Sequence, residues 1–224
     1  DQLGGRVNLI GLCQGGWMAL IYAARFAGKV GKLVLAGAPI DIGAGRSRLS
    51  ELARNTPISI FKELVEVGHG RVLGQHLLQL WDRNPIDREM IHQVLQFSDD
   101  VESSAFQHVE ARFRRWQVWT VDLPGTYYLQ VIEQLFKQNQ LPAGRFEALG
   151  RAIDLSNVQC PIFLLSARDD EIVAAEQLFA VERLVGSNCR IRKSIAPGTH
   201  LGLFMGRTTL LEAWPNLAHW VAQP

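Results

Sequence analysis

Residues 6–26 read RVNLIGLCQGGWMALIYAARF, and they decide how the rest of the chain can fold. The segment from Arg6 to Leu12 is short, apolar and bounded by glycines, as expected of a strand buried on both faces. The following residues place apolar side chains at helical spacing as far as Gly28, where glycine can end a helix. A second buried strand is expected from Lys32 to Ile40. A strand, a helix and a strand within about thirty residues indicate a parallel βαβ unit.

The chain is expected to be an α/β protein in three parts. Residues 1–42 form the first part of the core. Residues 43–150 form a helical cap insertion, because amphipathic patterns such as residues 61–81 and 126–139 predict helices and no buried strand. Residues 151–224 return to the core, with strands at 160–167 and 189–196 and a helix after each. Such an insertion is typical of a cap over the strand ends, where open α/β sheets bind ligands.

Composition excludes several classes of function. The 224 residues are 47% hydrophobic and 20% charged, with a formal net charge of +1 and no long run of one sign, which argues against a nucleic-acid partner. No apolar run is long enough to cross a bilayer. The three cysteines suggest neither a disulfide framework nor a metal site, so we expect no metal and a reducing compartment.

Gly11-Leu12-Cys13-Gln14-Gly15 fits the pattern of a nucleophile elbow, with cysteine in the place of serine. In this interpretation Gly11 and Gly15 are glycines because side chains there would collide across the turn. The N-terminus of the following helix favours a thiolate, and the Gln14 N–H supplies one oxyanion donor. The alternative is a buried structural cysteine. A dinucleotide fingerprint is disfavoured, because Cys13 occupies the position of its middle glycine.

A nucleophile of this kind needs a base and a carboxylate, in the chain order nucleophile, Asp, His. Asp169 and Asp170 follow the expected strand at 160–167, and His200 lies in a glycine-flanked loop after the last strand. These positions match the order, and the residues alone leave the choice between the two aspartates open. Four aromatic side chains are expected to line an apolar acyl tunnel under the cap, with core packing as the alternative: Trp116, Trp119, Tyr127 and Tyr128.

These sites together resemble the polyhydroxyalkanoate synthases and, more loosely, the intracellular polyhydroxybutyrate depolymerases, which share the α/β-hydrolase fold. GLCQGG (residues 11–16) is similar to the synthases' lipase-like box with cysteine. DEIV (residues 170–173) is similar to their Asp-x-Ile-Val pattern, which selects Asp170 over Asp169. GTHLG (residues 198–202) resembles their GHIG loop, with one extra residue before His200. Residues 116–141 and 149–173 resemble further stretches of the same family.

The resemblance implies an acyltransferase that uses Cys13, His200 and Asp170 and forms a covalent acyl-cysteine from 3-hydroxyacyl-CoA, with no cofactor besides that coenzyme A thioester. Cysteine suits thioester exchange and favours this reading over the alternative, a polyhydroxybutyrate depolymerase or related hydrolase. A non-catalytic relative that binds granules or partners is a third reading. The resemblance also implies a cytoplasmic protein associated with polyester granules. The sequence leaves open whether the protein forms a homodimer. We expect further strands, and the second oxyanion donor, before Asp1.

Overall fold

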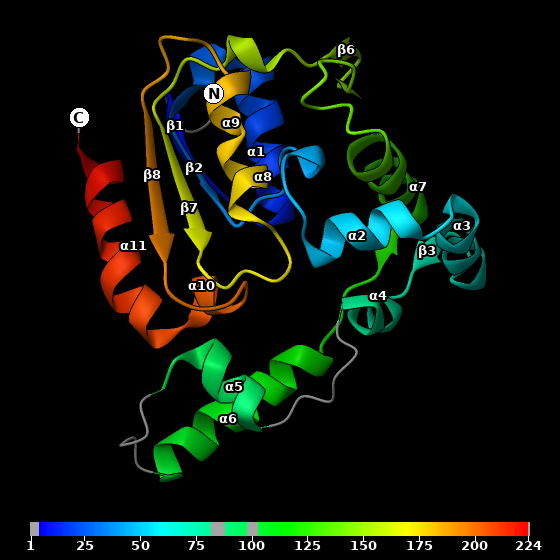
Figure 1. The fold of residues 1–224 in the computed structure, drawn as a ribbon, viewed down its shortest axis with the longest axis vertical. Coiled ribbons are helices and arrows are strands. Elements are labelled where there is room, and N and C mark those ends of the chain that lie inside the picture. Colours follow the sequence, from blue (N-terminus) through cyan, green and yellow to red (C-terminus); the bar gives the residue numbers. More distant parts are fainter. Residues whose placement is uncertain (1–4, 82–87, 98–102, 224) are drawn as a thin grey trace.

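The computed structural model describes residues 5–81, 88–97 and 103–223, and its centre is a parallel four-stranded sheet (Figure 1). The strands are β1 (Val7–Leu12), β2 (Val30–Ala36), β7 (Ile162–Ala167) and β8 (Ile191–Ala196), in the order β1-β2-β7-β8. β2 and β7 are neighbours although the whole insertion lies between them in the sequence. The insertion therefore leaves and rejoins the sheet between two adjacent strands.

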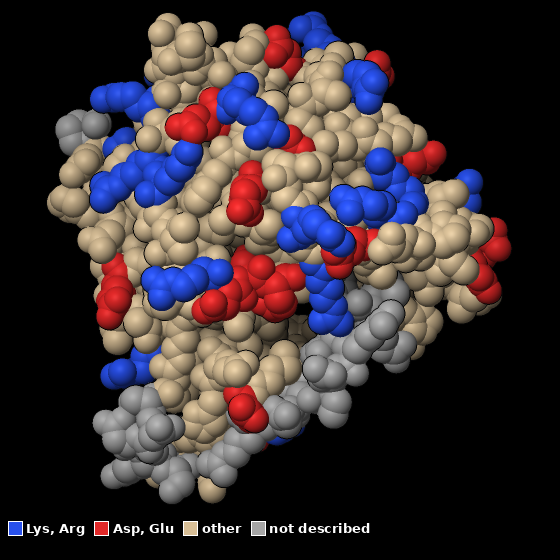
Figure 2. Space-filling view, viewed as in Figure 1, with Lys and Arg blue, Asp and Glu red and all other residues tan. Residues whose placement is uncertain are grey.

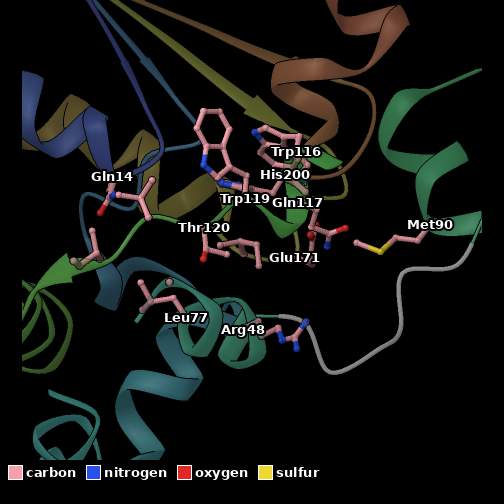
Figure 3. Close-up of a pocket in the computed structure, with 15 residues that line it drawn as sticks. Gln14, Arg48, Leu77, Met90, Trp116, Gln117, Trp119, Thr120, Glu171 and His200 are labelled. Carbon is pink, nitrogen blue, oxygen red and sulfur yellow. Dashed lines mark hydrogen bonds between the residues drawn. The ribbon is translucent and has the colours of Figure 1, made fainter. Parts of the chain in front are cut away.

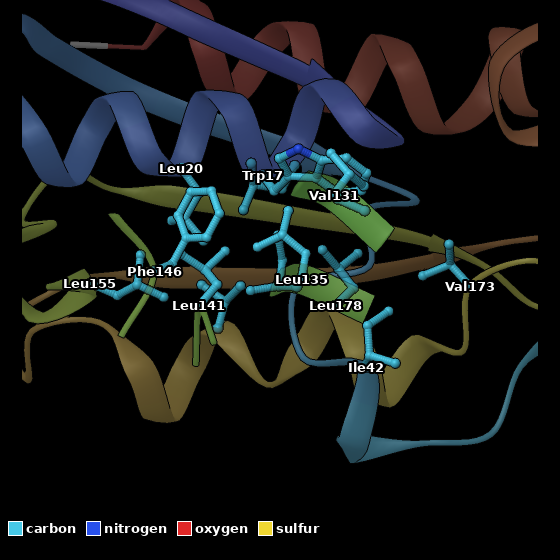
Figure 4. Close-up of a cluster of buried hydrophobic side chains, with 14 of the residues drawn as sticks. Trp17, Leu20, Ile42, Val131, Leu135, Leu141, Phe146, Leu155, Val173 and Leu178 are labelled. Carbon is cyan, nitrogen blue, oxygen red and sulfur yellow. The ribbon is translucent and has the colours of Figure 1, made fainter. Parts of the chain in front are cut away.

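Helices cover both faces of the sheet. One face carries α1 (Gln14–Arg25), α8 (Ala175–Phe179) and α9 (Val181–Leu184), and the other carries α10 (Gly202–Met205) and α11 (Arg207–Ala222) (Figure 1). The larger apolar core lies on the α1 face and joins the sheet to the insertion. Figure 4 shows part of it, with Trp17, Leu20, Leu135, Leu141, Phe146 and Leu178 packed together under α1. Burial of this apolar surface is the main term that stabilises the fold.

The expectation that β1 is buried on both faces is wrong. Along β1 the burial alternates, and the side chains of Ile10 and Leu12 are 51% and 42% exposed. β1 is the edge strand of the described sheet, and Leu9 faces the core beneath α1. The apolar cluster on the opposite face is built on β2, β7, β8, α10 and α11 and contains no residue of β1, so Ile10 and Leu12 stay partly exposed in the described chain.

The remaining elements, most of them in the insertion, are short helices and two antiparallel pairs of two-residue strands. Their bounds are η1 Ala27–Lys29, η2 Ile42–Ala44, α2 Arg48–Asn55, α3 Ile58–Val67, β3 Arg71–Val72, α4 Gly74–Trp81, α5 Arg88–Leu95, α6 Ser103–Val118, β4 Leu123–Pro124, α7 Gly125–Gln130, η3 Val131–Lys137, β5 Glu147–Ala148, β6 Arg151–Ala152 and η4 Leu155–Asn157. In Figure 1, α2, α3 and α7 lie to one side of the sheet, whereas α5 and α6 lie below it beside α10.

The helix expected over residues 61–81 is interrupted. α3 ends at Val67, and the chain turns through His69 and Gly70, which have φ angles of 52° and 87°. Such left-handed conformations cannot continue a right-handed helix. β3 follows and pairs antiparallel with β4, which ties the two ends of this part of the insertion together.

Two further observations concern the outside of the molecule. Within the described residues, no helix is both long and apolar enough to cross a membrane. On the face shown in Figure 2, basic and acidic side chains are interspersed, in keeping with the net charge of +1. That face therefore offers no single field of one sign to a charged partner.

Candidate active site

The predicted site residues lie beyond the carboxyl ends of the strands, on one side of the sheet. Cys13 directly follows β1, Asp170 follows the end of β7, and His200 follows the end of β8. The strands are parallel, so these three loops emerge on the same side. Backbone hydrogen bonds fix the loops to their neighbours: Cys13 N–H donates to Ala36 O at 2.9 Å, and Asp169 N–H donates to Gly198 O at 3.1 Å.

Cys13 occupies a strained turn between β1 and α1. Its φ and ψ are 49° and −121°, a combination that residues with a side chain rarely adopt. Cys13 is the N-cap of α1, so its thiol lies at the positive end of the helix. Gln14 is the first helical residue, and the N–H groups of a first turn have no acceptor within the helix. The Gln14 N–H is thus available to an oxyanion beside Cys13.

The structure bears out the expected role of one elbow glycine and not that of the other. A Cβ at Gly11 would lie 2.6 Å from Gly15 O and 2.6 Å from Gly16 Cα, so Gly11 is required by space. A Cβ at Gly15 would meet nothing within 4 Å, so the expectation that a side chain there collides is wrong. The crowded position is Gly16, where a Cβ would lie 2.2 Å from the Cβ of Ala38. The sequence motif marked Gly15, whereas packing against the segment after β2 selects Gly16.

The structure brings Asp170 to His200. His200 Nδ1 lies 3.0 and 2.9 Å from the two carboxylate oxygens of Asp170, and both side chains are almost fully buried. The Asp170 carboxylate also accepts the N–H groups of Ile172 and Val173, at 3.0 and 2.8 Å, which fixes its orientation. Asp169 is exposed and has no comparable contact with the imidazole among the described residues.

The electrostatic surroundings of His200 favour its protonated form. Burial lowers the pKa of His200, but the hydrogen bond with Asp170 and the hydrogen bond and charge of Cys13 outweigh it. Together these effects raise the pKa of His200 from 6.5 to about 10. Cys13 and Asp170 thus both favour a positive charge on the imidazole. Such an arrangement can hold a thiolate and an imidazolium as a pair and can return the proton to a leaving group.

Two residues at this site were missed by the sequence reasoning. Gly37 follows β2 with a φ of 54°, and a Cβ there would lie 3.1 Å from His200 Cε1. Its position just after an apolar strand was the only signal in the sequence. Glu171 accepts the backbone N–H of His200 through Oε2 at 3.2 Å, next to the Asp170 that holds the ring. Gly37 makes room for the imidazole, and Glu171 fixes the backbone that carries it.

Two cavities flank the pair of Cys13 and His200. The cavity that includes Cys13, here the Cys13 cavity, has a volume of about 440 Å³ and is lined mainly by apolar side chains of α1, α2, α3, α7 and η3. The cavity that includes His200, here the His200 cavity, has a volume of about 450 Å³. It contains the polar side chains Arg48, Gln117 and Glu171 (Figure 3). The linings of the two cavities share Gln14, Leu77 and Leu123.

The four aromatic residues expected in one tunnel are divided between these cavities. Tyr127 and Tyr128 line the Cys13 cavity, and the buried Tyr128 also packs against Phe61, with ring centroids 6.1 Å apart. Tyr127 donates its hydroxyl to Gln14 Oε1 at 3.2 Å. Trp116 and Trp119 line the His200 cavity instead, where they are 48% and 83% exposed (Figure 3). All four residues thus line a cavity, and their role in an acyl tunnel stays a prediction.

The site has the groups needed for covalent catalysis by a side chain. No group of three His, Cys, Asp or Glu side chains among the described residues could hold a metal ion. The chemistry available here is nucleophilic attack by the thiol, proton transfer by the imidazole and stabilisation of an oxyanion by backbone N–H groups.

Sequence comparisons connect the chain with one family and one group of enzymes. The model of the family described as "Protein of unknown function (DUF3141)" matches residues 2–191. The Poly(3-hydroxyalkanoate) polymerase subunit PhaC of Synechocystis sp. is 27% identical over 97% of this chain and 58% of its own length. The same subunit of Thiocystis violacea is 26% identical over 96% of this chain and 59% of its own length. The resemblance to polyhydroxyalkanoate synthases is confirmed, and the chain spans less than two thirds of these relatives.

Comparison with solved structures confirms the α/β-hydrolase fold. A monoacylglycerol lipase of Paleococcus ferrophilus superposes with a TM-score of 0.59 at 15% identity, covering 98% of this chain and 69% of the lipase. A putative non-heme bromoperoxidase, BpoC of Mycobacterium tuberculosis, gives a TM-score of 0.57 at 17% identity, with the same coverage. At these identities the likeness concerns the fold alone.

Proposed function

Because the chain belongs to the family described as "Protein of unknown function (DUF3141)", whose description assigns no activity, we propose a function from its site: a polyhydroxyalkanoate polymerase-like acyltransferase. Its substrate would be a 3-hydroxyacyl-CoA thioester, and its intermediate an acyl group on Cys13. The observation that carries this proposal is the position of His200, which is hydrogen-bonded to the Asp170 carboxylate and follows a parallel strand on the same side of the sheet as Cys13. The similarity to PhaC subunits over nearly the whole chain supports the choice of substrate class.

The first half of the proposed reaction transfers the acyl group to the enzyme. The Cys13 thiolate attacks the thioester carbonyl, and the resulting oxyanion accepts a hydrogen bond from the Gln14 N–H. The tetrahedral intermediate then expels the coenzyme A thiolate, and the His200 imidazolium donates its proton to that sulfur. Asp170 keeps the Nδ1 side of the ring occupied, so the other nitrogen faces Cys13 and the substrate.

The second half transfers the acyl group to an acceptor. Neutral His200 removes the proton of a hydroxyl on another 3-hydroxyacyl unit, whose oxygen attacks the acyl-cysteine carbonyl. The Cys13 thiolate leaves, and an ester bond has formed. Water in place of the hydroxyl would give a hydrolase with the same acyl-enzyme, so the product identifies the acceptor.

The test is a product analysis on the purified full-length protein. With 3-hydroxybutyryl-CoA, the proposal predicts release of coenzyme A together with an ester-linked oligomer or polymer. Free 3-hydroxybutyrate as the sole acyl product would establish hydrolysis instead of transfer. Absence of coenzyme A release with thioesters of several chain lengths would overturn the enzymatic proposal, since a non-catalytic relative would bind without turnover.

A further inference from the structure

The loop that carries His200 is fixed by a glutamine of the insertion. Gln96 follows the end of α5, and its Nε2 donates to Pro197 O at 2.9 Å. Its Oε1 accepts the backbone N–H of Thr209 at 3.0 Å. Pro197 precedes His200 by three residues, and Thr209 lies in the first turn of α11. One amide group thus ties the start of the His200 loop to the helix that follows it.

Glycines around the loop leave room for this side chain. A Cβ at Gly198 would lie 2.1 Å from Gln96 Nε2, and a Cβ at Gly206 would lie 2.5 Å from Gln96 Cδ and Oε1. Gly198 also has a φ of 99°, which a residue with a side chain rarely adopts. A side chain at either position would displace the Gln96 amide, and at Gly206 it would also lie 2.6 Å from Gly202 O. The hydroxyl of Thr209 completes the arrangement, at 3.2 Å from Pro197 O.

The residues after His200 are held from the same part of the insertion. α5 and α6 have a small apolar core of their own, formed by Ile91, Val94, Leu95, Phe106 and Phe113. Leu201 and Met205 pack against it. In Figure 1, α5 and α6 lie next to α10, below the end of the sheet. The loop is thus held before His200 by Gln96 and directly after it by Leu201.

We propose that Gln96 is a positioning residue, which sets the His200 backbone so that the imidazole reaches Cys13 and Asp170 together. The inference rests on the proposed pairing of Cys13 and His200. It assigns α5 and α6 a part in the chemistry although Gln96 touches neither the thiol nor the imidazole. When the amide is lost, His200 is expected to lose its alignment with Cys13 while the fold persists.

The experiment compares Gln96→Met with Gln93→Met in the purified full-length protein. Methionine keeps the length of the side chain and removes its donor and acceptors. Gln93 lies three residues earlier, is exposed on α5 and serves as the matched control. The first readout is the rate at which iodoacetamide alkylates Cys13 at pH 7, followed by mass spectrometry of the Cys13 peptide. The second is the NMR signal of the His200 Nδ1 proton, which hydrogen-bonded imidazoles show far downfield.

In Gln96→Met the alkylation rate is expected to fall about tenfold, because a displaced imidazole no longer accepts the proton of the Cys13 thiol and so no longer activates the nucleophile. The downfield proton is expected to broaden or exchange with solvent, and Gln93→Met is expected to match the wild type in both readouts. The proposal would be overturned by a Gln96→Met protein that has the unfolding temperature of the wild type and keeps both the wild-type alkylation rate and the downfield proton.

A double-mutant cycle covers the case in which Gln96→Met destabilises the fold. Thr209→Val removes the hydroxyl that shares Pro197 O with Gln96. If the two residues act as one clamp, the double variant loses little more alkylation rate than Gln96→Met alone. Additive losses would contradict the clamp. Neither readout needs a substrate, so wild-type protein that shows both signals but no thioester turnover would refute the proposed function and leave this inference standing.

Discussion

The two cavities beside the Cys13–His200 pair differ in what encloses them. The Cys13 cavity is bounded by buried residues of the insertion, such as Phe61 and Tyr128, which are 1% and 6% exposed. The lining of the His200 cavity includes highly exposed side chains beside the buried His200, and Trp119 and Val121 are 83% and 75% exposed. An enclosed apolar wall selects a ligand by length and shape, whereas an exposed wall lets groups enter and leave. We therefore expect the acyl chain in the Cys13 cavity, and the leaving group and acceptor on the His200 side.

The largest effect is expected from the carboxylate that holds His200 between the two cavities. Asp170→Asn should lower the rate of coenzyme A release by about 10³-fold or more, because the amide no longer holds His200 in the required tautomer. Asp169→Asn is the matched control, since Asp169 is exposed. Steady-state assays of both variants provide the measurement. Equal losses in the two variants would contradict the assignment of Asp170.

A change in the Cys13 cavity should alter acyl selectivity and little else. Leu52→Phe narrows this cavity from α2, so kcat/KM for an octanoyl thioester should fall about tenfold more than for a butyryl thioester. Val121→Phe, at the rim of the His200 cavity, should leave that ratio unchanged. Leu211→Phe, on the exposed side of α11, controls for the added ring. If Val121→Phe shifts the ratio as strongly as Leu52→Phe, the acyl chain does not occupy the Cys13 cavity alone.

A smaller effect concerns the titration of His200. Its pKa is raised to about 10, and removing the hydrogen bond and charge of Cys13 by Cys13→Ala should lower it. The folded value exceeds the ordinary 6.5, so the contribution of His200 to the free energy of unfolding is complete below pH 6.5 and is lost as the pH rises through 10. NMR titration of the imidazole in both proteins measures the shift. An unchanged pKa in Cys13→Ala would show that Asp170 alone sets the charge of His200.

The sequence predicted the site residues whose order along the chain is set by the fold. It did not predict the residues whose contacts depend on tertiary packing. Cys13, His200 and the pair Asp169 and Asp170 could be chosen because each follows an expected strand in the order that the fold requires, and the resemblance to the synthases then selected Asp170. Gln96 could not be chosen, since only the tertiary structure places it among Gly198, Gly206 and Thr209. The same holds for the elbow, where the motif selects Gly15 and the contact with Ala38 selects Gly16.

The fold, too, could be predicted in part from the sequence. The parallel sheet follows from apolar strands that alternate with helical patterns, and the comparisons confirm it. The exposure of Ile10 does not follow from the sequence, because an apolar strand has the same sequence pattern whether it lies at the centre or at the edge of a sheet. The break near His69 was missed although Gly68 and Gly70 flank it, because the amphipathic pattern continues across the turn. Boundaries at 43 and 150 between core and insertion remain a prediction.

The central claim is that Cys13 carries the acyl group, and peptide mass spectrometry after an acid quench tests it most directly. The full-length protein is mixed with 3-hydroxybutyryl-CoA, quenched in acid within seconds and digested. The account predicts a 3-hydroxybutyryl adduct on the peptide that contains Cys13. The adduct should be absent in Cys13→Ala and present in Cys189→Ala, whose thiol lies before β8, away from the strand ends that carry the site. Coenzyme A release by Cys13→Ala at the wild-type rate, or an adduct on another residue, would contradict the account.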